Sequence, residues 1–170
     1  MSTSDGPIDA HKLNRQPPSA AELEAAFAFA RPYFEHARRG NVDALRPALE
    51  AGLPANLTND KGDTLLMLAA YHGRLEAVKL LLEHKADPNR LNDRGQSILA
   101  GAIFKNENEI VQALLENGAN PHVGQPNAID TARTFNKIDW VERFERVDQI
   151  ELARSITSTS LDIKFGLKMS

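Results

Sequence analysis

A block of 33 residues occurs twice in the middle of the chain. Shifting the sequence by 33 aligns residues 59–91 with residues 92–124 without a gap, and twelve of the 33 positions are identical. The identical pairs include turn-forming, helix-forming and apolar residues: Asn59/Asn92, Asp60/Asp93, Gly62/Gly95, Leu66/Leu99, Ala69/Ala102, Glu76/Glu109, Val78/Val111, Leu81/Leu114, Leu82/Leu115, Glu83/Glu116, Ala86/Ala119 and Pro88/Pro121. A repeat of this length indicates a solenoid, in which one unit buries its apolar face only against its neighbours. We therefore expect more than two units.

Each unit has the pattern of two short helices joined by a turn. Thr64 can accept a hydrogen bond from a backbone N–H in the first turn of a helix, and Gly73 is placed to end that helix. An apolar stripe at helical spacing predicts a second helix: Leu75, Val78, Leu81 and Leu82. Lys85 follows this helix at a position that favours Gly in the left-handed region, and Gly118 stands there in the next unit. Each unit is therefore expected to be a helix–turn–helix pair.

Two more divergent units flank the central pair. Residues 34–56 align with the template after a shift of 33, and residues 127–144 align after a shift of 63, with a turn that is three residues shorter. Divergent outer units are typical of solenoid caps. The predicted organisation is a tail over 1–18, a helical cap over 19–31, repeats over approximately 32–58, 59–91, 92–124 and 125–147, and an extension over 148–170.

The repeated unit closely resembles the ankyrin repeat, over about Phe34–Phe144. It reads G-x-T-x-L-x-x-A-A-x-x-G-x-x-x-x-V-x-x-L-L-x-x-x-A-x-P-N. Where the family typically has G-x-T-P-L-H, this chain has Leu65 and Ile98 in place of Pro, and Met67 and Ala100 in place of His. The resemblance implies an all-α solenoid of about four helix–turn–helix repeats with an added N-terminal helix, similar to small stand-alone ankyrin proteins of bacteria and fungi. Without the His, its side-chain hydrogen bonds between repeats should be absent, and the stack should rely more on apolar packing.

The two ends of the chain depart from the repeat. Residues 1–18 have few large apolar side chains and predict a disordered tail. Ser19 and Glu22 fit a capping box at the start of a helix that should lie over the first repeat, and Arg31-Pro32 should separate this helix from the next. After the last repeat the amphipathic pattern weakens, and "SITSTS" argues against a helix. We expect an extended C-terminal tail, free or loosely docked.

The composition excludes several classes of protein. The chain has no cysteine, so disulfides, thiol catalysis and Cys-based metal sites are excluded. A net charge of −3 gives no general attraction to nucleic acid or acidic lipid. The first residues lack the basic start and apolar run of a signal peptide, and no apolar stretch reaches the ~20 residues that cross a bilayer. We expect a soluble, monomeric cytoplasmic protein, or a nuclear one in a eukaryotic host.

No constellation of residues indicates catalysis, a metal or a cofactor. The five histidines have no ligand-like spacing, and the glycines form neither a dinucleotide-binding nor a P-loop pattern. Asp60, Asp63, Asp87 and Asp93 have the character of turn residues whose side chains bond nearby backbone. We therefore expect no enzyme activity and no cofactor. Asn89 lies in a context that resembles a hydroxylated ankyrin asparagine; the alternative is a loop residue that bonds its own backbone.

The remaining variable positions predict a surface for a partner protein. The resemblance places this surface on the loop tips and on the solvent side of the first helix of each unit. The expected partner-binding residues are Arg38, Arg39, Asp60, Lys61, Tyr71, His72, Asp93, Arg94, Phe104, Lys105, Thr134 and Phe135. Aromatic residues are favoured in interface hot spots, so Tyr71, Phe104 and Phe135 should form an exposed apolar patch, unless one or two of these rings pack onto neighbouring repeats.

The leading hypothesis is a protein-binding adaptor or regulatory scaffold without catalysis. An alternative is an accessory or regulatory subunit of an enzyme or of a transcription-related complex. A small-molecule binder would need a closed pocket with convergent polar groups, which the repeat template does not supply. A modest basic stripe of Arg38, Arg39, Arg94 and Lys105 raises nucleic-acid binding as a third hypothesis, which the negative net charge disfavours.

Overall fold

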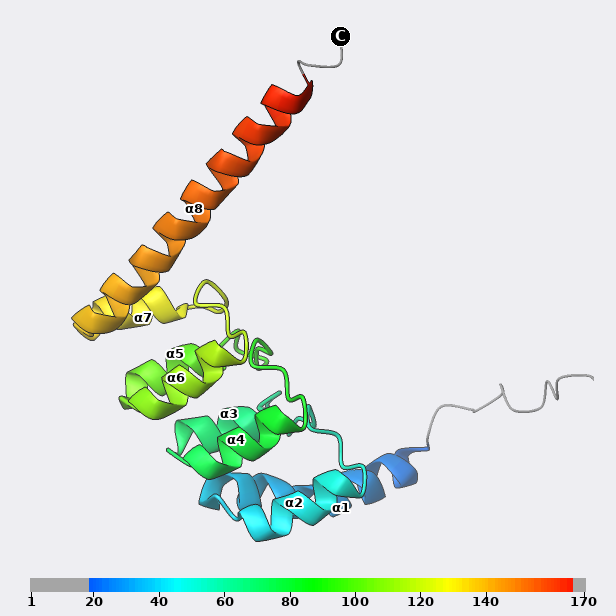
Figure 1. Ribbon diagram of the computed structural model, residues 1–170. Helices are drawn as coiled ribbons and strands as arrows, with labels where there is room; N and C mark the ends of the chain where they lie inside the picture. Colours follow the sequence, from blue (N-terminus) through cyan, green and yellow to red (C-terminus); the bar gives the residue numbers. More distant parts are fainter. Residues whose placement is uncertain (1–18, 167–170) are drawn as a thin grey trace, which may run out of the picture. The chain divides into compact units, whose positions relative to one another are not determined.

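The computed structural model describes residues 19–166, and within them the regular secondary structure is helical (Figure 1). The helices are α1 (Ala20–Arg39), α2 (Val42–Glu50), α3 (Leu65–Tyr71), α4 (Leu75–Glu83), α5 (Ile98–Lys105), α6 (Asn108–Glu116), α7 (Ala128–Thr134) and α8 (Ile138–Gly166). The chain divides into two compact units, Met1–Pro32 and Tyr33–Ser170. The predicted all-α fold is confirmed.

In the unit from Tyr33 onward, helix pairs stack on one another in two rows. Helices α3, α5 and α7 pack in one row, which we call the inner row, and α2, α4 and α6 pack in the other. Figure 1 shows the pairs α3–α4 and α5–α6 lying one above the other, with α7 and the start of α8 next in the stack. The aligned Ala69, Ala102 and Ala132 have no exposed surface, because small side chains let the inner helices approach closely.

The same capping device begins each inner helix. Thr64 Oγ1 accepts from the N–H of Met67 at 3.0 Å, as predicted. Ser97 caps α5 in the same way at 3.2 Å, and Asn127 caps α7 at 2.8 Å. Each cap satisfies an N–H that the helix itself leaves unpaired, so the start of each inner helix is determined by one residue of the repeat.

Left-handed residues end the helices where the repeat predicts them. Gly73 has φ +69°, and the aligned Asn106 and Asn136 take φ +64° and +53°. Lys85 has φ +65° at the position where Gly118 stands in the next unit, which confirms the predicted strain. A non-glycine residue in this region costs about 1 kcal/mol relative to Gly.

Buried amides link successive repeats. Asn92 is 6% exposed, and its Nδ2 donates to Asp63 Oδ1 of the preceding turn at 2.9 Å. Its Oδ1 accepts from the N–H groups of Arg94 and Gln96, which closes its own turn. Side-chain hydrogen bonds of Asn92 thus join the two turns, although this chain lacks the His that makes such bonds in the family.

Asn89 makes a second link of this kind. Its Nδ2 donates to the carbonyl of Gly118 at 2.9 Å, and its Oδ1 accepts from the N–H of Asn120 at 2.7 Å. Both partners belong to the next repeat, so the expectation that this side chain bonds its own backbone is wrong. The two repeats lie close enough for the amide to bridge them.

The expected break at Arg31-Pro32 is wrong, because α1 runs from Ala20 to Arg39 with Pro32 inside it. Proline removes the helical hydrogen bond that its N–H would donate to the carbonyl of Ala28, and its ring crowds that carbonyl, which kinks a helix more often than it ends it. Ala28 is exposed, so water can satisfy that carbonyl. A helix in an exposed position can therefore continue through a single proline.

The expectation of an extended C-terminal tail is also wrong for residues up to Gly166, because α8 contains the "SITSTS" segment. Ser and Thr each cost only a few tenths of a kcal/mol in a helix. A helix that is already nucleated extends at no further nucleation cost, so weak helix formers can continue it. The predicted disorder of residues 1–18 and the end of the tail at 167–170 lie outside the described residues.

Candidate functional site

Three aromatic side chains stand side by side along the inner row. Tyr71 ends α3, Phe104 lies near the end of α5, and Phe135 follows α7. Their side chains are 43%, 47% and 47% exposed, which confirms an exposed apolar patch. The rings of Phe104 and Phe135 meet edge to face with centroids 5.0 Å apart, so these two also pack onto each other across neighbouring repeats. We call Tyr71, Phe104 and Phe135 the aromatic row.

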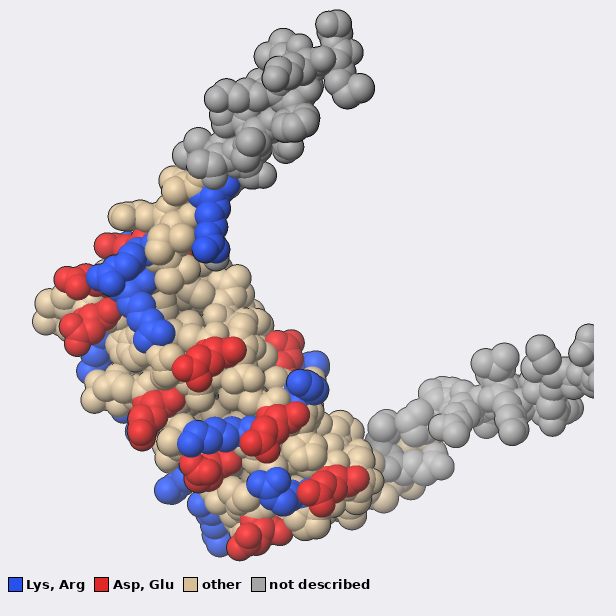
Figure 2. Space-filling view, viewed as in Figure 1, with Lys and Arg blue, Asp and Glu red and all other residues tan. Residues whose placement is uncertain are grey.

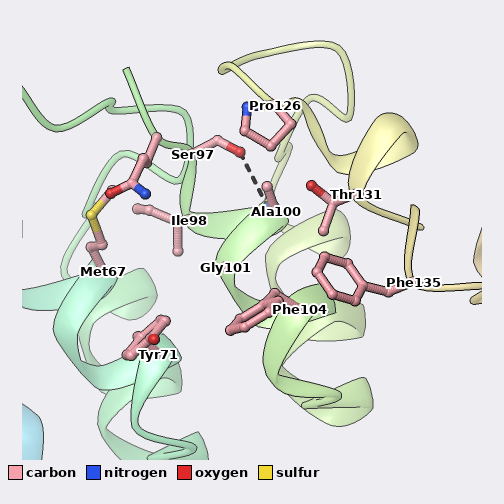
Figure 3. A pocket seen from close by; sticks show the side chains of 11 residues that line it. Met67, Tyr71, Ser97, Ile98, Ala100, Gly101, Phe104, Pro126, Thr131 and Phe135 are labelled. Atoms are coloured by element: carbon pink, nitrogen blue, oxygen red, sulfur yellow. Dashed lines mark hydrogen bonds between the residues drawn. The ribbon is translucent and has the colours of Figure 1, made fainter. Parts of the chain in front are cut away.

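A hollow of about 270 Å³ opens between the aromatic row and the starts of the inner helices (Figure 3). It is lined from three successive helices, mainly by Met67, Tyr71, Gly101, Phe104, Thr131 and Phe135. Pro126 and the capping Ser97 close its other end. The hollow is predominantly apolar and open on one side, so it can take an apolar group from solvent.

Gly101 forms the middle of this hollow. In the preceding repeat the aligned residue is Leu68, and in the following repeat it is Thr131. A Cβ added at Gly101 would meet Cδ2 of Tyr71 at 3.7 Å, an ordinary van der Waals contact. Its φ is not in the left-handed region, so the backbone does not require glycine there. Gly101 thus lines the hollow without adding a side chain to it.

Two hydroxyl groups at the wall of the hollow, those of Ser97 and Thr131, make hydrogen bonds within the chain. Ser97 Oγ accepts from the N–H of Ala100, and Thr131 Oγ1 donates to the carbonyl of Asn127 at 2.8 Å. The Thr131 hydroxyl thus donates within its own helix, and Ser97 Oγ is occupied as the acceptor of the capping bond. The hollow therefore favours an apolar guest over a polar one.

A basic edge follows the aromatic row. Lys105 Nζ lies 5.1 Å from the centroid of the Tyr71 ring, a cation–π distance. The His72 ring also contacts Tyr71, edge to face, with ring centroids 5.7 Å apart and an interplanar angle of 79°. Both side chains are exposed. Lys105 and His72 therefore place positive or ionisable groups beside the hollow.

The arginines that end α1 are paired within their own helix. Glu35 Oε1 accepts from Arg39 Nε at 2.8 Å, and its Oε2 lies 3.4 Å from Arg38 Nη1. The hydrogen bond from Arg39, with the charges of both arginines, lowers the pKa of Glu35 against the opposing effect of desolvation. Arg38 and Arg39 stay partly exposed, and a partner would compete with Glu35 for them.

The predicted tip residues form a separate group, away from the lining of the hollow. Asp60, Lys61, Asp93 and Arg94 are exposed on two neighbouring turns. A backbone hydrogen bond from Asp93 N–H to the Lys61 carbonyl, 3.1 Å long, joins these turns. Thr134, also predicted as a contact, donates its hydroxyl to the Asp130 carbonyl of its own helix.

Two features of the surface escaped the sequence reasoning. Gly101 is one. Its place inside a predicted helix, where the aligned residue of the preceding repeat is Leu68, could have indicated an open space. The other is Trp140, whose Nε1 donates to Asn108 Oδ1 at 2.9 Å and whose ring lies 5.2 Å from the Arg143 guanidinium. Trp140 joins α8 to α6 and has its indole N–H satisfied.

Other surfaces offer less chemistry. On the face in Figure 2, Lys and Arg are interspersed with Asp and Glu, so no field of one sign covers that face. Among the residues whose side chains the structure describes, no group of three or more His, Cys, Asp or Glu could hold a metal ion. None of the described helices is long and apolar enough to cross a membrane.

A stack of helix pairs with an aromatic row on its inner helices defines a repeat scaffold. The family model for ankyrin repeats (3 copies) matches residues 34–125, more than half of the chain. The chain therefore belongs to the ankyrin repeat family, as the sequence resemblance indicated. Ankyrin repeats are generally protein–protein interaction modules, typically without catalysis.

Two known proteins are similar to parts of this chain. Ankyrin repeat protein PA3287 of Pseudomonas aeruginosa is 56% identical over 45 residues, which are 26% of this chain and 26% of that protein. The crystal structure of the human ASB11 ankyrin repeat domain is similar with a TM-score of 0.54 and 28% identity, over 59% of this chain and 47% of that one. The chain thus matches about a quarter of the first protein and about half of the second.

Proposed function

We propose that the chain is a non-enzymatic adaptor or regulatory scaffold that binds a protein partner on the aromatic row and the adjoining hollow. The observation that carries this proposal is the exposure of Tyr71, Phe104 and Phe135 on three successive inner helices, each between 43% and 47%. Contiguous aromatic surface around an apolar hollow is what interfaces bury at their centres. The tip residues Lys61 and Arg94 would lie at the polar rim.

The hydrogen bonds between successive repeats support this assignment of the surface. Asn89 and Asn92 are already bonded between repeats, so their amides serve the stack. About half of each aromatic residue of the row stays in solvent, although the rings of Phe104 and Phe135 also pack against each other. A partner that covers them removes apolar area from water, which favours binding by about 25 cal/mol per Å² before the cost of association.

Affinity capture with matched variants tests the proposal. One variant carries Tyr71→Ala, Phe104→Ala and Phe135→Ala; the control carries Leu91→Ala, Ile138→Ala and Val147→Ala, which also remove three exposed apolar side chains. Proteins captured from the native host are quantified by mass spectrometry. We expect a partner that the control retains and the aromatic-row variant loses, with both variants keeping the helical circular dichroism of the folded wild type. Retention by a folded aromatic-row variant would contradict the proposal.

A further inference from the structure

The glycine at the centre of the hollow has no structural explanation in the repeat. Gly101 lies inside α5, where glycine is the least favourable residue after proline. Its backbone is not left-handed, and no atom crowds the space of a Cβ. The neighbouring repeats place Leu68 and Thr131 at the same position. Gly101 weakens its own helix and leaves open space beside it. A guest group that enters this space would account for the glycine.

The size of the hollow selects the kind of guest. Pockets for drug-sized small molecules have volumes of about 300–1,000 Å³, and this one has about 270 Å³. The hollow lies near the lower end of that range, and one bulky side chain would fill much of it. Its walls are Met67 and the three rings of the aromatic row, and the hydroxyls of Ser97 and Thr131 are already bonded within the chain. The guest should be bulky and apolar.

The positive charge of Lys105 beside the hollow favours an acidic residue next to the bound side chain. Lys105 stands over the Tyr71 ring, and among the described residues no Asp or Glu forms an ion pair with it. The positions aligned with Lys105 in the two preceding repeats are His72 and Arg39. His72 and Lys105 thus place basic or ionisable groups at the ends of α3 and α5, whereas Arg39, at the end of α1, is paired with Glu35. A carboxylate next to the guest side chain would find a partner in Lys105.

From these observations we infer that the hollow over Gly101 is a specificity pocket for one bulky apolar side chain of an acidic partner segment. The apolar side chain fills the space between Tyr71, Phe104 and Phe135, and a neighbouring Asp or Glu pairs with Lys105. This inference rests on the proposed function and names the partner's chemistry at the same surface. Gly101 acts as a specificity-determining residue by having no side chain.

Selection from a displayed library of random dodecapeptides tests the inference with the full chain as target. Enriched peptides should contain a Leu, Ile, Met or aromatic residue with Asp or Glu within two positions. Replacing that apolar residue by Ala should weaken binding roughly tenfold or more. Lys105→Gln should weaken it about threefold, and added salt should reduce this difference.

The decisive variant is Gly101→Leu, which fills the hollow and is a better helix former than glycine. It should keep the fold and lose binding of the enriched peptides by roughly tenfold or more. Gly101→Ala, which adds one methyl group in ordinary contact with Tyr71, is a milder version that should reduce binding less. Lys85→Gly is the matched control, because it relieves backbone strain outside the hollow and should leave binding unchanged.

The outcomes separate the inference from the proposed function. Peptides that bind the aromatic row yet lack the acidic and apolar pattern, or that bind folded Gly101→Leu as well as wild type, would overturn the inference alone. No enrichment, or binding unaffected by the triple alanine variant of the aromatic row, would overturn both. Binding that follows the pattern and is lost in Gly101→Leu supports both.

Discussion

The ring of Phe104 meets the ring of Phe135 edge to face, with centroids 5.0 Å apart, although the two residues come from successive repeats. Each ring is still 47% exposed. One pair of side chains therefore contributes to the stack and to the surface at once. This dual role makes the energetic coupling of the pair measurable apart from any binding.

A double-mutant cycle on Phe104 and Phe135 should reveal that coupling. Edge-to-face pairs contribute about 0.5–1.5 kcal/mol beyond area burial, and partial exposure favours the lower half of this range. We expect Phe104→Ala, Phe135→Ala and the double variant to give a coupling energy of about 0.5–1 kcal/mol in urea unfolding. Additive effects would show that the rings do not stabilise each other.

Gly101→Ala should raise the stability of the fold. Alanine is favoured over glycine by about 1 kcal/mol in a helix interior, and its Cβ meets only an ordinary contact here. The midpoint of urea unfolding should rise without a change in slope. An equal or lower midpoint would mean that the space over Gly101 is needed for packing.

Lys85→Gly should also raise stability, by about 1 kcal/mol. The cause is relief of the left-handed backbone at φ +65°, which Gly adopts without strain. Lys85→Ala is the control, since it keeps the strain and should leave the unfolding free energy nearly unchanged. Equal effects of Gly and Ala would assign the change to the lysine charge.

Asn92→Ala should destabilise the stack by about 2–3 kcal/mol. The substitution leaves the N–H groups of Arg94 and Gln96 without their acceptor and removes the bond to Asp63 in the preceding repeat. Asn120→Ala is a matched control, because Asn120 is exposed and its Oδ1 serves only the N–H of His122. Thermal unfolding followed by circular dichroism compares the two.

Glu35 should titrate below the ordinary range of a glutamate. Its folded pKa is lowered mainly by the Arg39 hydrogen bond, so its pairing stabilises the fold above the unfolded pKa of about 4.3 and is lost as the pH falls through the lower folded value. Arg39→Ala should raise the pKa of Glu35 toward that of a free glutamate. Carbon-detected NMR of the side-chain carboxyl measures both values.

The repeat template placed much of the surface correctly from sequence. The aligned positions of Tyr71 and Phe104 predicted neighbouring exposed rings, because a fixed period puts equivalent residues on the same side of a stack. The template could not predict the hollow, since its depth depends on the absence of one side chain between two helices. It also missed the ion pairs of Glu35, which depend on rotamers.

The ends were harder to predict for a different physical reason. Inside the repeats, the role of a cap or turn residue can be read from two aligned positions, as for Thr64 and Ser97, which make the same capping hydrogen bond. No counterpart exists for Pro32 or for the "SITSTS" segment of α8. The local helix propensity predicted that the helix would end at both places, but α1 and α8 continue through them.

Hydrogen exchange of the chain with and without its captured partner tests the central claim most directly. If the partner lies on the aromatic row, amides of α5 around Gly101 and Phe104 should gain protection, together with those near Tyr71 and Phe135. The outer helices α4 and α6 should change little. Protection confined to α4, α6 and the region of Trp140 would contradict the account, because the partner would then occupy the opposite row of helices.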